Sequence, residues 1–161
     1  MDGWDSFFGA QVSASAALAG LVFVGVSINL PKIMSNPGLP NCVLEAIIAL
    51  VTVLIESSLL LVPGQPVALH GVAALLVGLV MGALTATVNR AVFREAALRP
   101  YHRRYVAHVV LSQLAMGAFV AAGVVMLLRG AGGVYVVVPG IIVCYVVALI
   151  DAWILLIEIN R

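Results

Sequence analysis

The chain has very little charge of either sign. Eight Lys or Arg and seven Asp or Glu make 9% of its 161 residues charged, against about 25% in an ordinary soluble domain. A soluble globule of this length could not cover its surface with so few charges. The shortage therefore excludes a soluble enzyme and a disordered tail. The net charge of +1 supplies no basic surface, so we expect no nucleic-acid partner.

Cysteine and the common chemical motifs are also scarce. The two cysteines, Cys42 and Cys144, lie in unrelated apolar contexts, and no CxxC or HExxH motif is present. The GxSxG pattern of a serine nucleophile is missing as well. We therefore expect buried free cysteines, no cofactor, no metal site marked by ligand spacing and no enzymatic activity.

Apolar sequence makes up most of the chain, with 63% hydrophobic residues and a mean hydropathy of +1.18. A helix needs roughly 20 apolar residues to cross a bilayer, and in lipid its backbone has no other hydrogen-bond partner. Five stretches meet this length: residues 7–30, 42–62, 67–89, 106–128 and 134–159. The sequence predicts an all-α integral membrane protein, a single helical domain over residues 1–161 with five spans and no soluble domain.

The basic residues predict the orientation of the spans. Five of them fall in the predicted loop 90–105: Arg90, Arg94, Arg99, Arg103 and Arg104. Loops rich in Lys and Arg stay in the cytoplasm, which places the N-terminus outside and the C-terminus inside. Lys32 and Arg161 then lie inside too, and only Arg129 lies outside. The loop either signals topology alone or also contacts anionic lipid headgroups through Arg94, Arg99, Arg103 and Arg104.

Small residues in the spans predict close helix packing. Ala16 and Gly20 are spaced four apart, and Gly78 and Gly82 form a GxxxG match. These glycines either join copies of the chain or pack helices within one copy. Pro139 interrupts the hydrogen bonding of the fifth span and predicts a kink, for packing or for a hinge.

Four acids within the spans are the most informative residues. An acid at mid-bilayer costs about 2.5–3.5 kcal/mol, so it faces a partner or water. Glu45 and Glu56 are eleven residues apart, and Asp151 and Glu158 are seven apart, so each pair shares one helix face. We expect these faces to meet in a polar seam.

The four acids are not equivalent. We expect Glu45 in the first turn of its helix, near cytoplasmic water, and Glu158 at the inner boundary of the membrane. Glu56 and Asp151 have no Lys or Arg in their own spans.

Histidines provide a possible partner for each of these deeper acids. Counting depth from the short loops places His70 within one helical turn of Glu56, and His108 within one turn of Asp151. Such pairs serve either a stepwise proton relay or cation site, or hydrogen bonding that only fixes the helix register.

Two functions follow from these patterns. The first is a homo-oligomeric membrane protein that conducts or transports a proton or cation along the carboxylate-lined seam. The second is a non-transporting accessory protein that binds another membrane complex through glycine-rich helix faces. An intramembrane enzyme is the least favoured class, because no catalytic constellation is present.

Three segments carry a resemblance to a known group of proteins. They are ALAGLVFVGVSIN at residues 17–29, PGLP at 37–40 and LLVPGQ at 60–65. Together they resemble a family of small bacterial inner-membrane proteins, sometimes labelled as modulators of a membrane AAA protease. The resemblance covers mainly the first two spans and implies a multi-pass protein of the bacterial inner membrane. Its motifs carry no chemistry, so it implies no functional residues.

Overall fold

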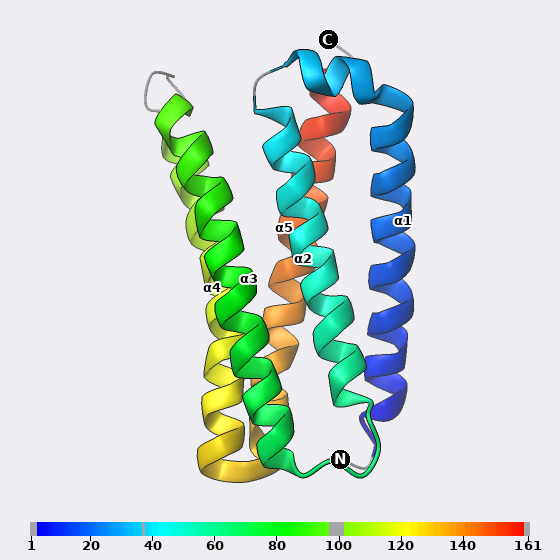
Figure 1. Ribbon diagram of the computed structural model, residues 1–161, viewed down its shortest axis with the longest axis vertical. Helices are drawn as coiled ribbons and strands as arrows, with labels where there is room; N and C mark the ends of the chain where they lie inside the picture. Colours follow the sequence, from blue (N-terminus) through cyan, green and yellow to red (C-terminus); the bar gives the residue numbers. More distant parts are fainter. Residues whose placement is uncertain (1–2, 37, 97–101, 160–161) are drawn as a thin grey trace.

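The computed structural model is a bundle of long helices (Figure 1). It describes residues 3–36, 38–96 and 102–159, and the side chains of 3–36, 38–90 and 106–157. A 3-10 turn, Gly130–Gly133, joins the last two helices, and the described residues contain no strand. The helices are α1 (Asp5–Ser35), α2 (Leu39–Leu60), α3 (Val67–Ala96), α4 (His102–Arg129) and α5 (Val134–Ile159).

Four helical stretches are long and apolar enough to cross a membrane, as in a multi-pass membrane protein. They are Asp5–Ser35, Leu39–Leu60, Val67–Arg90 and Val106–Ile157. The last stretch contains most of α4, the 3-10 turn and most of α5. In Figure 1, α4 and α5 run in opposite directions on either side of that turn.

Local backbone chemistry explains where α2 begins. Gly38 precedes the helix with φ 101°, a left-handed conformation that glycine adopts without strain. Pro40 lies in the first turn, where its missing N–H is no loss. The helix therefore begins at Leu39, ahead of the apolar run that the sequence analysis used.

The bundle is apolar outside and partly polar inside, the reverse of a soluble protein. Large exposed side chains include Phe23, Ile28, Leu128 and Trp153. The buried polar residues are Ser15, Glu45, Thr52, Glu56, Ser57, His70, Thr85, Asn89, Ser112 and Asp151. This distribution suits a surface in contact with lipid and an interior in which polar groups meet one another.

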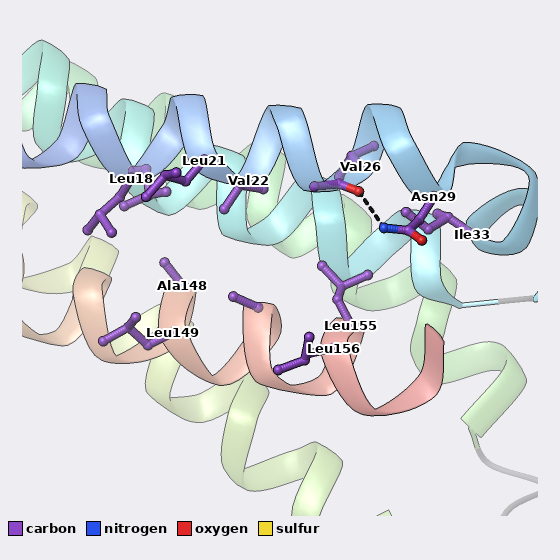
Figure 2. A pocket seen from close by; sticks show the side chains of 13 residues that line it. Leu18, Leu21, Val22, Val26, Asn29, Ile33, Ala148, Leu149, Leu155 and Leu156 are labelled. Atoms are coloured by element: carbon purple, nitrogen blue, oxygen red, sulfur yellow. Dashed lines mark hydrogen bonds between the residues drawn. The ribbon is translucent and has the colours of Figure 1, made fainter. Parts of the chain in front are cut away.

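Helix α1 lies at the edge of the bundle and packs chiefly against α2. Its N-terminal end is tied to α5, because the Trp4 ring meets Tyr135 edge-on at 5.1 Å and the Tyr145 hydroxyl donates to the Gln11 carbonyl at 3.2 Å. Farther along, an apolar groove of about 260 Å³ separates α1 from α5 (Figure 2). Helix α1 is thus the least embedded of the helices.

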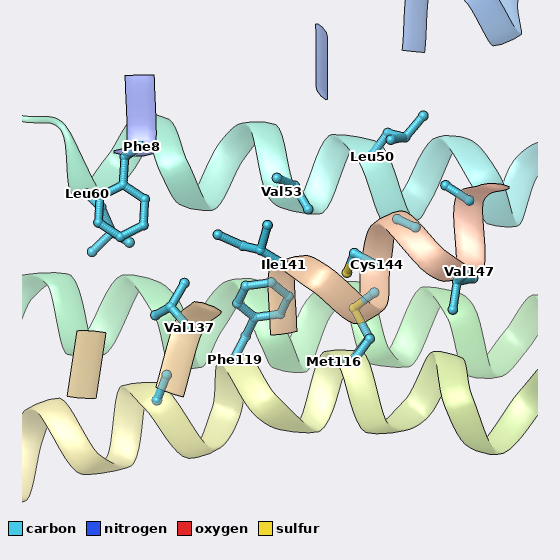
Figure 3. Close-up of a cluster of buried hydrophobic side chains, with 14 of the residues drawn as sticks. Phe8, Leu50, Val53, Leu60, Met116, Phe119, Val137, Ile141, Cys144 and Val147 are labelled. Atoms are coloured by element: carbon cyan, nitrogen blue, oxygen red, sulfur yellow. The ribbon is translucent and has the colours of Figure 1, made fainter. Parts of the chain in front are cut away.

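The apolar core fills the space between α2, α4 and α5. Met116 and Phe119 of α4 lie near Ile141 and Cys144 of α5, with Val53 of α2 on the other side (Figure 3). All five are at most 3% exposed. This core occupies the centre of the bundle along its length.

Helices α3 and α4 pack closely together where the GxxxG glycines lie. A Cβ added at Gly78 would come 2.8 Å from the backbone nitrogen of Val120, and one at Gly82 would come 3.3 Å from Met116 Cβ. Both glycines therefore serve packing within one chain. Gly20 differs, because nothing lies within 4 Å of the position its Cβ would take.

Helix α5 runs through Pro139 as one helix, Val134–Ile159, with the bounds that the sequence predicts. The next residue, Gly140, faces α4, since an added Cβ would lie 3.2 Å from the Ala118 Cβ. The proline and glycine thus stand where α5 comes close to α4.

Candidate functional site

Three ionisable side chains from three helices meet inside the bundle. They are Glu45 of α2, His108 of α4 and Asp151 of α5, and we call them the acid–histidine cluster. Glu45 and His108 each lie six residues into their helices, and Asp151 lies eight residues before the end of α5. The cluster is therefore near the end of the bundle where α2 and α4 begin and α5 ends.

The distances within the cluster are short. Nε2 of His108 is 3.1 Å from Oδ1 of Asp151, and Nδ1 is 3.8 Å from Oε2 of Glu45. Nε2 nevertheless has no hydrogen-bond partner among the described residues, so the 3.1 Å approach is not aligned as a hydrogen bond. The imidazole thus lies between two carboxylates.

The cluster is almost closed to the surroundings. Asp151 is 1% exposed and Glu45 is 5% exposed. Oδ2 of Asp151 and Oε1 of Glu45 have no hydrogen-bond partner in the described part of the chain. Buried polar atoms without partners are uncommon in native proteins, so these two oxygens are free to take a proton, a water molecule or an ion.

Helix α3 contributes to the same region through Asn89. Its side-chain amide donates to the Ser112 hydroxyl at 3.1 Å, and that hydroxyl donates to the Val109 carbonyl at 3.1 Å. Asn89 and Ser112 are also polar neighbours of the Glu45 carboxylate. Four helices therefore contribute to the cluster and its surroundings.

The predicted position of Glu45 in the first turn of its helix was wrong, because α2 begins at Leu39 and its first turn contains no acid. Glu45 lies about 1.7 turns into the helix and is buried in the cluster, with 5% of its surface exposed.

The two predicted acid–histidine pairs have different outcomes. Asp151 lies beside His108 as expected. His70 is buried, its Nδ1 has no hydrogen-bond partner among the described residues, and its ring lies near the Leu59 backbone in the last turn of α2. Neither carboxylate oxygen of Glu56 has a hydrogen-bond partner among the described residues, although its side chain is only 1% exposed.

Glu56 shares a helix face with Glu45, but the space between them is closed. Eleven residues of helix separate the two acids by about 16 Å. Thr52 lies between them, and its hydroxyl donates to the Ile48 carbonyl at 2.6 Å and contacts Met116 Sδ at 3.9 Å. The gap lined by Glu45, Met116 and neighbouring side chains has no room for a water molecule.

A polar pocket lies at the opposite end of the bundle. It has a volume of about 420 Å³ and is lined by His70, Gln65 and Asp5 among others. His70 is 4% exposed and lines this pocket together with Leu60, the last residue of α2.

Some predicted site residues fall outside the described side chains. These are Glu158, with its predicted position at the inner boundary, and the predicted headgroup contacts Arg94, Arg99, Arg103 and Arg104. Asn89 was not singled out from the sequence. Its signal was a lone amide at the end of an apolar run.

No protein-family model, curated protein or solved structure matches the chain. The similarity of the first two spans to small bacterial membrane proteins stays a prediction. The function is therefore argued from the geometry of the site.

Proposed function

We propose that this protein conducts or transports a proton or a cation along the seam formed by the acid–histidine cluster and Glu56. One observation carries the proposal. Three acids are buried in the interior of an apolar helical bundle, and no Lys or Arg lies in α2 or between residues 130 and 160. Acids in such positions mark ion pathways and proton relays in membrane proteins.

The chemistry of the cluster suits reversible charge binding. A histidine between two carboxylates has a proton-binding group on each side of its ring, so a proton can pass among the three side chains. The apolar surroundings strengthen each charge interaction, so one bound proton or cation changes the electrostatic interactions among all three side chains.

The closed segment between Glu45 and Glu56 indicates a gated path rather than an open pore. Met116 lies in this segment, and its unbranched side chain can change rotamer with little strain. We propose that a shift of α4 against α2 moves Met116 and admits water between the two acids.

The finer topology belongs to the same proposal. Helices α4 and α5 have 28 and 26 residues, enough for each to cross a bilayer, which makes five spans. Lys32 in the last turn of α1 and Arg90 of α3 would face the cytoplasm, with Arg129 at the other side. We place the chain in a bacterial inner membrane, with the C-terminus inside.

We also propose that the chain forms a homo-oligomer, although the seam itself does not run between copies. The seam lies inside one chain, so a second copy is not needed to build it. The exposed apolar face of α1, including Phe23 and Ile28, is the surface that would join copies.

Flux measurements test the transport proposal. The purified chain in proteoliposomes should pass protons or cations, and the double variant Glu56→Gln, Asp151→Asn should lose the flux. Asp5→Asn is the matched control, because it removes an exposed acid at the start of α1. Equal flux in a correctly folded double variant, or none in the wild type across a range of pH and cations, contradicts transport.

An accessory role is the second candidate, and the shape of α1 favours it. Gly20 and Gly25 of α1 have open space where a Cβ would stand, and Gly25 lines the apolar groove between α1 and α5. A partner helix could pack there, whereas Gly78 is already occupied by α4. Co-purification of a membrane partner that Gly20→Leu abolishes would support this role, and Gly78→Leu would report on folding instead.

A further inference from the structure

We propose that the acid–histidine cluster binds a divalent first-row transition-metal ion. The ligands are one imidazole nitrogen of His108 and one oxygen each from Glu45 and Asp151. This inference rests on the proposed function, because the metal site is the same acid–histidine cluster at one end of the seam. It adds the class of cation that the cluster binds. Binding is nevertheless measurable without any transport.

The ligand atoms already converge. One His108 nitrogen and one oxygen of each carboxylate all lie within 4.8 Å of one another. With bonds of about 2.1 Å, two ligands on one tetrahedral ion are about 3.4 Å apart. Rotations that move the carboxylates by about 1 Å would close the site around an ion.

The unpartnered atoms of the cluster are available as metal ligands. Oδ2 of Asp151 and Oε1 of Glu45 are without hydrogen-bond partners among the described residues, on side chains that are 1% and 5% exposed. The His108 Nε2 contact at 3.1 Å is close but misaligned for a hydrogen bond. The cluster therefore contains buried donor atoms whose coordinating capacity its own side chains leave unused.

Charge and donor type select the ion. Two carboxylates carry two negative charges, and a divalent cation with a neutral imidazole brings the buried site to neutrality. A nitrogen donor favours Mn²⁺ to Zn²⁺ over Mg²⁺ and Ca²⁺, which prefer oxygen alone. No sulfur belongs to the set, so soft ions such as Cu⁺ are disfavoured.

The neighbours of the cluster supply the outer support that metal ligands need. Ser112 and Asn89 are polar neighbours of the Glu45 carboxylate and are bonded to each other at 3.1 Å. Hydrogen-bonding groups of this kind orient ligating carboxylates and raise metal affinity.

The test is Co²⁺ binding to the full chain, purified without a histidine tag, stripped with a chelator and held in lipid nanodiscs. We expect one Co²⁺ per chain, a visible ligand-field spectrum, displacement by Zn²⁺ and no displacement by excess Mg²⁺. Each of Glu45→Gln, His108→Gln and Asp151→Asn should weaken binding by at least about 100-fold. Glu56→Gln is the matched control, because it removes a buried acid on the same face of α2 and should leave affinity unchanged.

Absence of Co²⁺ binding to the wild type overturns the inference, as does equal weakening by Glu56→Gln. If a cluster variant fails to fold, X-ray absorption of the wild-type Co²⁺ complex identifies the ligands of the bound ion instead. One imidazole with oxygen ligands supports the site, and two imidazoles or a sulfur ligand overturn it. Ion flux without Co²⁺ binding would refute only the metal site, and Co²⁺ binding without flux would refute only transport.

Discussion

The contact between α3 and α4 allows a sharp test of the packing. Replacing Gly78 with Ala places a Cβ 2.8 Å from both the backbone nitrogen and Cγ2 of Val120, and 3.1 Å from the Met116 carbonyl oxygen. Backbone atoms cannot rotate away, so the two helices must separate by several tenths of an ångström. Overpacking of this kind costs about 1–3 kcal/mol.

Gly117→Ala is the matched control, because Gly117 lies within α4 and nothing lies within 4 Å of its added Cβ. Both substitutions gain about 0.5–1 kcal/mol from better helix propensity. The difference between the two variants therefore isolates the packing penalty, and Gly78→Ala should be less stable than Gly117→Ala by about 1–3 kcal/mol.

Reversible unfolding in mixed detergent micelles measures this difference. A second change, Val120→Ala, removes Cγ2 but leaves the backbone nitrogen, so it should restore only part of the loss in Gly78→Ala. Equal stability of the Gly78→Ala and Gly117→Ala variants would refute the close packing of α3 on α4. Full rescue by Val120→Ala would show that the clash involves the side chain alone.

Three further predictions concern buried groups. Asp151→Asn takes the charged partner from His108 and should lower the free energy of unfolding by about 1–3 kcal/mol, measured in the same micelles; an unchanged value contradicts the 3.1 Å contact. Glu56→Gln should change stability by less than about 1 kcal/mol, because the carboxylate has no hydrogen-bond partner to lose; a larger loss would reveal one. Cys42, which is partly exposed, should react with a maleimide before the buried Cys144, followed by mass spectrometry; the reverse order contradicts the packing of α5.

Much of the helical architecture is predictable because lipid imposes a simple rule. An apolar run of about 20 residues marks a helix, and both ends of α5 at Val134 and Ile159 follow from such a run. Helix caps are harder to predict. The apolar run of α2 starts at Cys42, but the helix starts at Leu39, because a glycine and a proline outside the run set its first turn.

The candidate site is predictable only in part. Helical periodicity places Glu45 and Glu56 on one face, but it does not say which helix this face meets. Depth counting across a short loop brings Asp151 to His108, since both residues lie at similar distances from the turn. The same count fails for His70, because neither its Nδ1 nor the Glu56 carboxylate has a hydrogen-bond partner among the described residues.

The contribution of four helices to one polar region has a consequence for biogenesis. Glu45 enters the membrane with α2, while its partner His108 is synthesised 63 residues later. Until α4 is inserted, the nascent chain holds an unsatisfied acid in or near the lipid, at a cost of about 2.5–3.5 kcal/mol at mid-bilayer. Asp151 is inserted last and lies against the same histidine. Chains that stop before α4 should therefore be less stable in the membrane, because they lack His108.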